Sequence, residues 1–155
     1  MEAIKITNPN WLPAIAPRIA EYNKILAVPG MTYEALYAYF AQAIQYSGGA
    51  TEFWVVFDED EPVAFAHWMT RGLPFTGKAY FDHLYKWSKS KKPIGLLIEK
   101  FTDFYKRFHC TLADANPVNE QVAEIFSQWA NEHSWEMKRN DFIYLTFSFY
   151  PEKEK

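Results

Sequence analysis

The segment at residues 89–95 holds the residues whose types and spacing point most directly to chemistry. Lys89, Lys91 and Lys92 come immediately before Pro93, and an apolar periodic segment follows. A helix that begins at Pro93 leaves its first backbone N–H groups without intrahelical partners and points the positive end of its dipole at the loop. Such a helix start, with three cations beside it, is suited to bind phosphate groups. The alternative is a solvated basic turn in front of a core helix, since lysine runs are common on surfaces.

Two elements must position this loop. Residues 78–87 are predicted to form an apolar-rich strand that enters it. The segment that leaves it carries apolar residues at helical spacing, namely Ile94, Leu97, Ile98, Phe101, Phe104, Tyr105 and Phe108. We therefore predict a strand, a lysine-rich loop and an amphipathic helix in this order.

The composition indicates one domain and excludes several classes of protein. The chain has 155 residues, which is enough to bury a core, and 19% of them are aromatic. Its formal net charge of −3 lacks the basic excess of nucleic-acid-binding surfaces, so we expect no nucleic-acid partner. The sequence contains no apolar run of membrane-spanning length and no secretion signal at its N-terminus. We therefore expect a cytoplasmic (intracellular) protein without a membrane partner.

Cys110 is the single cysteine, which excludes an intramolecular disulfide and a cysteine-rich zinc site. A reducing intracellular compartment fits this usage. The position of Cys110 at the end of a helical pattern favours a small buried hydrophobe over a nucleophile.

The first half of the chain is predicted to contain four strands and two helices. A strand at residues 2–7 is followed by a helix that Pro13 and Pro17 confine to residues 18–26, with Tyr22 on its apolar face. Thr32 is the predicted N-cap of the second helix, which carries Tyr39 on its apolar face. Three strands follow, at residues 52–57, 62–70 and 78–87, and an acidic turn at residues 58–61 joins the first two as an antiparallel hairpin.

The second half completes a mixed sheet. After the helix that begins at Pro93, we predict a strand at residues 109–115, a helix opened by Asn116-Pro117 and a closing strand at residues 141–150. The predicted fold class is α/β (α+β), with a mixed, mostly antiparallel central sheet, helices on both faces and the order β-α-α-β-β-β-α-β-α-β. Residues 1–150 form one domain in this prediction, and residues 151–155 form a charged C-terminal tail.

This order of elements, together with the strand, loop and helix at residues 80–105, resembles the GNAT superfamily of acyl-CoA N-acyltransferases over nearly the whole chain. In that family the fourth strand is followed by a loop of the form Arg/Gln-x-x-Gly-x-Gly/Ala, whose backbone N–H groups hold the pyrophosphate of coenzyme A. The six corresponding positions here are Ser90, Lys91, Lys92, Pro93, Ile94 and Gly95.

Ile94 and Gly95 match this pattern, whereas Ser90 replaces the Arg or Gln and Pro93 replaces a glycine and removes one N–H donor. The resemblance implies acetyl-CoA as the acyl donor. It places the cofactor against the fourth strand and the helix start, at Tyr85, Trp87, Lys89, Lys91, Lys92, Ile94 and Gly95.

A second family pattern, Asn-x-x-Ala-x-x-aliphatic-Tyr, maps onto Asn119, Val122, Ile125 and Phe126. Asn119 is kept and is assigned with Phe126 to the cofactor site. Phe126 stands where the family usually has a tyrosine that protonates the departing thiolate, so an active enzyme would need another acid or solvent.

Acyl transfer to an amine requires a base, and polarisation of the thioester carbonyl by a backbone N–H of the fourth strand. Through the resemblance, His83 is the candidate catalytic base, because it lies at the parity that the family often uses for Glu or His bases and its unperturbed pKa is close to neutral. Tyr85 then lies near the carbonyl-polarising position. The alternative is a hydrogen-bonded sheet histidine without a catalytic role.

His67 lies on the preceding strand at a parity that faces the same cleft, whereas alternation predicts that Asp82 points to the opposite face from His83. A metal site built from His67, His83, His109 and His133 has no short ligand spacing to support it. We therefore predict no metal ligand.

Two hypotheses of different class follow. The first is an acyl-CoA-dependent N-acyltransferase, in its simplest form an N-acetyltransferase, that acts on a small-molecule or protein amine. The second is a catalytically inactive GNAT-fold binding or assembly protein, such as a phage structural or accessory protein, which would be virion-associated. Trp54, Trp68 and Trp87 form an acceptor cleft under the first hypothesis and an interface under the second. Assembly into a homo-oligomer stays open.

Overall fold

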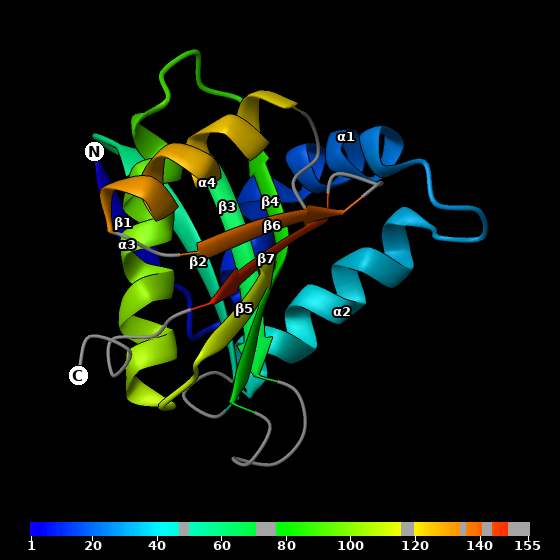
Figure 1. Cartoon of the computed structure of the whole chain (residues 1–155). Coiled ribbons are helices and arrows are strands. Elements are labelled where there is room, and N and C mark those ends of the chain that lie inside the picture. Colours follow the sequence, from blue (N-terminus) through cyan, green and yellow to red (C-terminus); the bar gives the residue numbers. More distant parts are fainter. Residues whose placement is uncertain (47–49, 71–76, 116–119, 134–135, 141–143, 149–155) are drawn as a thin grey trace.

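The computed structural model describes residues 1–46, 50–70, 77–115, 120–133, 136–140 and 144–148. One seven-stranded sheet runs through it in the order β1-β2-β3-β4-β5-β7-β6 (Figure 1). Only β4 and β5 pair in parallel, and the other neighbours are antiparallel. The strands are β1 (Glu2–Lys5), β2 (Thr51–Asp58), β3 (Glu61–Thr70), β4 (Lys78–Lys86), β5 (Leu112–Ala115), β6 (Glu136–Asn140) and β7 (Tyr144–Ser148).

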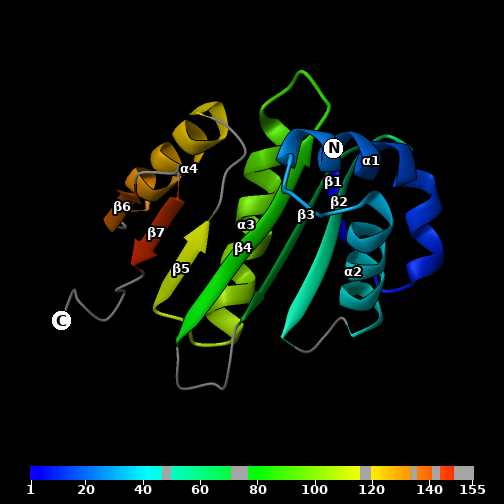
Figure 2. The same ribbon diagram turned by 90° about the vertical axis from the view of Figure 1, so that its right-hand side faces the viewer.

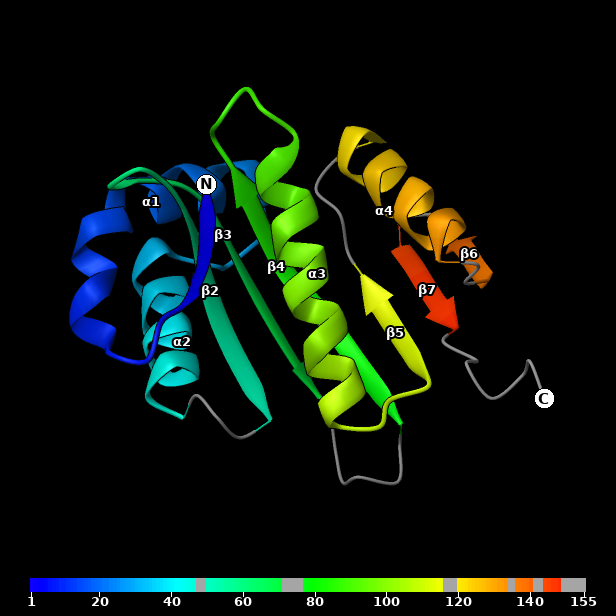
Figure 3. The ribbon, with the colours of Figure 1, turned by 90° about the vertical axis from the view of Figure 1, so that its left-hand side faces the viewer.

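Helices cover both faces of this sheet, as predicted (Figures 2 and 3). One face carries the 3-10 helix η1 (Pro9–Ile15), α1 (Ala16–Leu26) and α2 (Tyr33–Gln45), and the other carries α3 (Lys92–Arg107) and α4 (Glu120–Glu132). We call them the α1/α2 face and the α3/α4 face. Thr32 caps α2 by accepting a hydrogen bond from the Ala35 N–H, and Pro17 lies in the first turn of α1, where its missing N–H costs nothing.

Each face has its own buried core. On the α1/α2 face, Tyr22, Phe40, Phe53 and Phe65 are fully buried. On the α3/α4 face, Trp68 packs against Phe81 and Phe101. Apolar side chains of β2 and β3 therefore enter both cores, because alternate residues of a strand point to opposite faces. Two cores that both contain large rings account for the high aromatic content of the chain.

The predicted α/β fold is confirmed, with three local differences. A short strand, β6, was not predicted and gives the sheet its edge. The strand predicted at residues 109–115 begins only at Leu112, because His109 has a φ of 54°, in the left-handed region. Residues 9–15 form a 3-10 helix before α1. The predicted tail at residues 151–155 lies outside the described residues.

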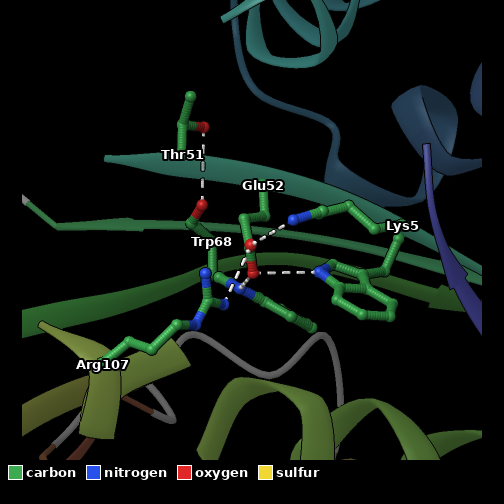
Figure 4. Close-up of polar contacts among 6 residues, drawn as sticks. Lys5, Thr51, Glu52, Trp68 and Arg107 are labelled. Carbon is green, nitrogen blue, oxygen red and sulfur yellow. Dashed lines mark hydrogen bonds and ion pairs between the residues drawn. The ribbon is translucent and has the colours of Figure 1, made fainter. Parts of the chain in front are cut away.

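A buried carboxylate connects three neighbouring strands of the sheet to the end of α3 (Figure 4). Glu52 on β2 is fully buried on the α3/α4 face and accepts hydrogen bonds from Lys5 at 3.3 Å and Arg107 at 3.0 Å. The indole N–H groups of Trp54 and Trp68 donate to its other oxygen at 3.1 and 3.0 Å. Glu52 therefore links β1, β2, β3 and the end of α3.

No helix in the described part of the chain is long and apolar enough to cross a membrane.

Candidate active site

A register shift in β4 decides which side chains meet on the α1/α2 face. His67 of β3 pairs with His83, but the next residue, Trp68, pairs with Phe81, so Asp82 has no partner of its own in β3. This is a β-bulge, which turns two consecutive side chains toward one face. The prediction that Asp82 points away from His83 is therefore wrong, because strict alternation does not hold across the bulge.

The bulge brings a carboxylate between two imidazoles. Asp82 Oδ2 lies 3.6 Å from His67 Nδ1 and 3.5 Å from His83 Nε2, and it accepts a hydrogen bond from the Tyr39 hydroxyl at 3.0 Å. His67 is fully buried, while the Asp82 side chain is 30% exposed. We call His67, Asp82 and His83 the β3–β4 cluster.

The second nitrogen of each imidazole contacts a hydroxyl group. His83 Nδ1 lies 2.8 Å from the Tyr22 hydroxyl of α1, and His67 Nε2 lies 2.8 Å from Thr51 Oγ1 of β2. The rings of Tyr39 and Phe40 pack edge-on against the imidazoles. Hydroxyls and aromatic rings from three elements thus fix both imidazole orientations.

Burial sets the charges in the β3–β4 cluster. Removal from water lowers the pKa of His83 from 6.5 to about 4, although the charge of Asp82 opposes this. Burial alone would raise the pKa of Asp82. His67, His83 and the Tyr39 hydroxyl outweigh this effect and lower the pKa to about 2. Near neutral pH, His83 is therefore neutral and Asp82 is ionised. The pKa of His83 is thus lower than the near-neutral value expected from the sequence.

A cavity of about 300 Å³ opens beside the β3–β4 cluster. Tyr39, Thr51, His67, Tyr46 and Met69 are among the residues that line it. A larger cavity of about 570 Å³ lies at β1, next to Trp11 and Phe57, and includes none of the predicted site residues. The smaller cavity therefore reaches His67 of the cluster, and the partly exposed Asp82 has its own access to solvent.

The strands β4 and β5 separate next to this cluster. In the part of the chain that the structure describes, they pair from Lys78–Leu112 to Phe81–Ala115, and β4 continues to Lys86 beyond the last residue of β5. Figures 2 and 3 show the two strands diverging toward the end of β4. Asp82 and His83 are the first residues of β4 beyond this pairing.

The start of α3 carries the predicted lysines but few spare backbone donors. Lys89, Lys91 and Lys92 are exposed. The Lys92 N–H donates to the Ser90 hydroxyl and the Ile94 N–H to the Lys91 carbonyl, while Pro93 has no N–H. An anion at this helix start would therefore be held chiefly by lysine side chains.

Ile94 is fully buried in the α3/α4 core, and Gly95 has open space where a Cβ would stand. The glycine of the loop pattern is therefore not required by packing within this chain.

Tyr85 and Trp87 lie on the α1/α2 face at the end of β4. The Tyr85 hydroxyl donates to Glu21 at 3.0 Å, and the Trp87 indole N–H donates to the Pro62 carbonyl at 2.9 Å. Trp54 and Trp68 stack on each other on the α3/α4 face. The predicted single surface of three tryptophans is therefore wrong, because Trp87 lies across the sheet from the other two.

Phe126 of α4 is buried and packs edge-on against Phe81 of β4. Asn119 falls outside the described residues. Of the second family pattern, the structure therefore locates the residues on α4. Phe126 among them contacts Phe81, the last residue of β4 that pairs with β5.

Acetyltransferases are among the solved structures similar to this chain. The GNAT domain of S. lividans PAT gives a TM-score of 0.68 at 10% identity, covering 95% of this chain and 89% of that one. PaiA N-acetyltransferase from Thermoplasma acidophilum, in complex with coenzyme A, gives 0.63 at 14% identity, covering 97% and 100%. Ribosomal-protein-alanine N-acetyltransferase from Brucella melitensis biovar Abortus 2308 gives 0.62 at 18% identity, covering 83% and 91%.

The chain has the GNAT fold. The resemblance inferred from the sequence is confirmed at this level. No protein-family model matches the sequence, and no curated protein sequence does. At these identities, the GNAT fold of the chain is shown by structure alone, and its chemistry has to be argued from the site.

Sequence reasoning placed His67 and His83 on one face of the GNAT fold, and the structure brings them together as a cross-strand pair. It missed Asp82, Tyr22, Tyr39 and Thr51 as members of the same site. Tyr22 is buried on the inward face of α1 as predicted, whereas Tyr39 on the predicted apolar face of α2 is 37% exposed. The apolar pattern carries no signal about which polar group a tyrosine hydroxyl contacts.

Proposed function

We propose that the protein is an acyl-CoA-dependent N-acyltransferase, in its simplest form an N-acetyltransferase, that acts on an amine of a small molecule or a protein. The observation that supports this most is the place of the β3–β4 cluster, where β4 leaves β5 in a fold shared with N-acetyltransferases. Acetyl-CoA supplies the activated acetyl group when bound.

His83 is the proposed base. The proposed role uses the tautomer with the proton on Nδ1, where the Tyr22 hydroxyl at 2.8 Å can accept it. In that tautomer the Nε2 lone pair faces Asp82 at 3.5 Å. An acceptor ammonium placed between these atoms donates to both, and transfer of one proton to Nε2 leaves a nucleophilic amine. The carboxylate of Asp82 then stabilises the imidazolium that forms.

The cavity at Tyr39, Thr51 and His67 is the proposed route of the acceptor to this point. Its lining is mainly apolar, with aromatic rings from Tyr39 and Tyr46, so the group that carries the amine is expected to be apolar or aromatic near its reacting end.

The pyrophosphate of the cofactor is proposed to lie at the start of α3, against Lys89, Lys91 and Lys92. Replacement of all three lysines by Ala is expected to weaken acetyl-CoA binding by at least about tenfold and to flatten its salt dependence, because charge-assisted contacts are lost. Isothermal titration calorimetry with acetyl-CoA at two salt concentrations measures both effects.

The matched control removes three lysines elsewhere, Lys24, Lys100 and Lys106, which changes the net charge equally. This control should retain most of the wild-type affinity. Equal loss in both triple variants would show a general charge effect, and unchanged affinity in the loop variant would remove the pyrophosphate from this helix start.

A second candidate function is a non-catalytic binding or assembly protein, such as a phage accessory protein. The observation that favours it is the start of α3, where two backbone N–H groups bond within the chain and Pro93 supplies none. Thermal unfolding with and without acetyl-CoA separates the two, since a ligand of the native state raises its apparent stability. We expect a rise, and no shift at millimolar acetyl-CoA would favour the non-catalytic function.

A further inference from the structure

We propose that His67, Asp82 and His83 form a binding site for one divalent transition-metal ion, for which Zn²⁺ is the best candidate. The ligand atoms are His67 Nδ1, Asp82 Oδ2 and His83 Nε2, which all lie within 4.8 Å of one another. This inference does not rest on the proposed acyl transfer.

Two of the three separations of the ligand atoms are close to those around a shared ion, and the third is at most 4.8 Å. The two distances to Asp82 Oδ2, 3.5 and 3.6 Å, exceed a good hydrogen bond. Ligand atoms about 2.0–2.1 Å from a tetrahedral Zn²⁺ are about 3.3–3.4 Å from each other. Small side-chain movements would therefore complete three bonds to one ion.

A buried nitrogen without a partner points at the same place. His67 is 1% exposed, and its Nδ1 has no hydrogen-bond partner among the residues that the structure describes. Its other nitrogen, Nε2, forms a hydrogen bond with Thr51 Oγ1. The Thr51 hydroxyl also donates to the Trp68 carbonyl at 3.4 Å. When Thr51 donates to that carbonyl it can accept from Nε2–H, and Nδ1 then has the lone pair that a cation requires. The other tautomer, with Nδ1–H toward Asp82, gives up that proton when the ion binds.

Both imidazoles also have the outer contacts of metal ligands. In metal sites, a ligating histidine usually donates its other N–H to an oxygen atom, which fixes the ring and its tautomer. Thr51 Oγ1 and the Tyr22 hydroxyl, each at 2.8 Å, occupy these positions for His67 and His83. The Tyr39 hydroxyl supports the third ligand by donating to Asp82.

The site has access and space for a fourth ligand. Asp82 is partly exposed, and the cavity of about 300 Å³ reaches His67. Two imidazoles and one carboxylate favour Zn²⁺ over Mg²⁺ and Ca²⁺, which prefer oxygen ligands. Alternation along one strand does not predict this site, because its ligands come from two strands and Asp82 joins them only through the bulge.

An ion here would occupy the Nε2 lone pair that the proposed base uses. Bound Zn²⁺ and general-base catalysis by His83 are therefore mutually exclusive, and Zn²⁺ is expected to act as an inhibitor of any acyl transfer.

The test uses untagged full-length protein that has been treated with a chelator and dialysed. Isothermal titration calorimetry with ZnSO₄ should show one site, and MgSO₄ should show none. His67→Ala, Asp82→Asn and His83→Ala should each weaken Zn²⁺ binding by about 10- to 100-fold or more. His109→Ala and His133→Ala, which change exposed histidines, are the controls and should bind as wild type.

Folding of each variant is checked by circular dichroism, and the Co²⁺ form of the wild type should show the visible absorption bands of a tetrahedral site. Absence of Zn²⁺ binding at 100 μM, or binding that survives all three ligand changes, would overturn the proposal. Acetyl-CoA titration of the metal-free protein is a separate readout, so failure of the metal site and failure of the acyltransferase proposal are distinguishable.

Discussion

His83→Ala is expected to lower the turnover of acetyl transfer by about 10²–10⁴-fold while acetyl-CoA affinity stays close to that of the wild type. The physical reason is that the variant removes the lone pair that accepts the ammonium proton but leaves the lysine-rich loop at the start of α3 intact. Turnover is measured at saturating acetyl-CoA and amine in chelator-treated protein, with free thiol release as the signal, and affinity by calorimetry.

His67→Ala is the matched comparison, because it removes the neighbouring imidazole and should reduce turnover less than His83→Ala. His109→Ala, at an exposed position outside the β3–β4 cluster, should leave turnover unchanged. Equal turnover of His83→Ala and wild type would exclude His83 as the base. Equal losses in His67→Ala and His83→Ala would instead indicate that the cluster acts as one structural unit.

Much of the fold could be predicted because each element carries its own local signal. Thr32 is a good N-cap by residue type, and it caps α2 in the structure. β6 was missed because Glu136–Asn140 reads Glu-Met-Lys-Arg-Asn, with one apolar residue and no alternation. Such a strand is specified by its pairing with β7, which a single segment of sequence does not reveal.

The candidate site was predicted only in part because it depends on one residue of register. The rule of alternation placed His67 and His83 correctly, since their pairing lies on one side of the bulge. The same rule misplaced Asp82, which is the extra residue itself. Residue types around Phe81 give no sign of a bulge, because the shift arises from how two strands fit together.

Glu52→Ala is expected to lower the free energy of unfolding by about 3 kcal/mol, because four hydrogen-bond donors lose the buried carboxylate that accepts from them. The buried indole N–H of Trp68 would lose its acceptor, and Lys5 and Arg107 would lose their shared anion. Urea unfolding followed by tryptophan fluorescence measures the change, and Glu99→Ala, at an exposed position of α3, is the control.

The pH dependence of this loss gives the sharper test, through Glu52→Gln, which keeps the size and removes the charge. Burial alone would raise the pKa of Glu52, but hydrogen bonds from Arg107, Trp54 and Trp68 outweigh it and hold the pKa below its ordinary value of 4.5. A carboxyl whose pKa is lower in the folded than in the unfolded state stabilises the fold fully above the unfolded pKa, and this is lost as the pH falls through the folded pKa. The stability difference between wild type and Glu52→Gln should therefore be constant above pH 5 and shrink below it. A difference that stays the same down to acid unfolding would show that Glu52 acts through packing and not through its charge.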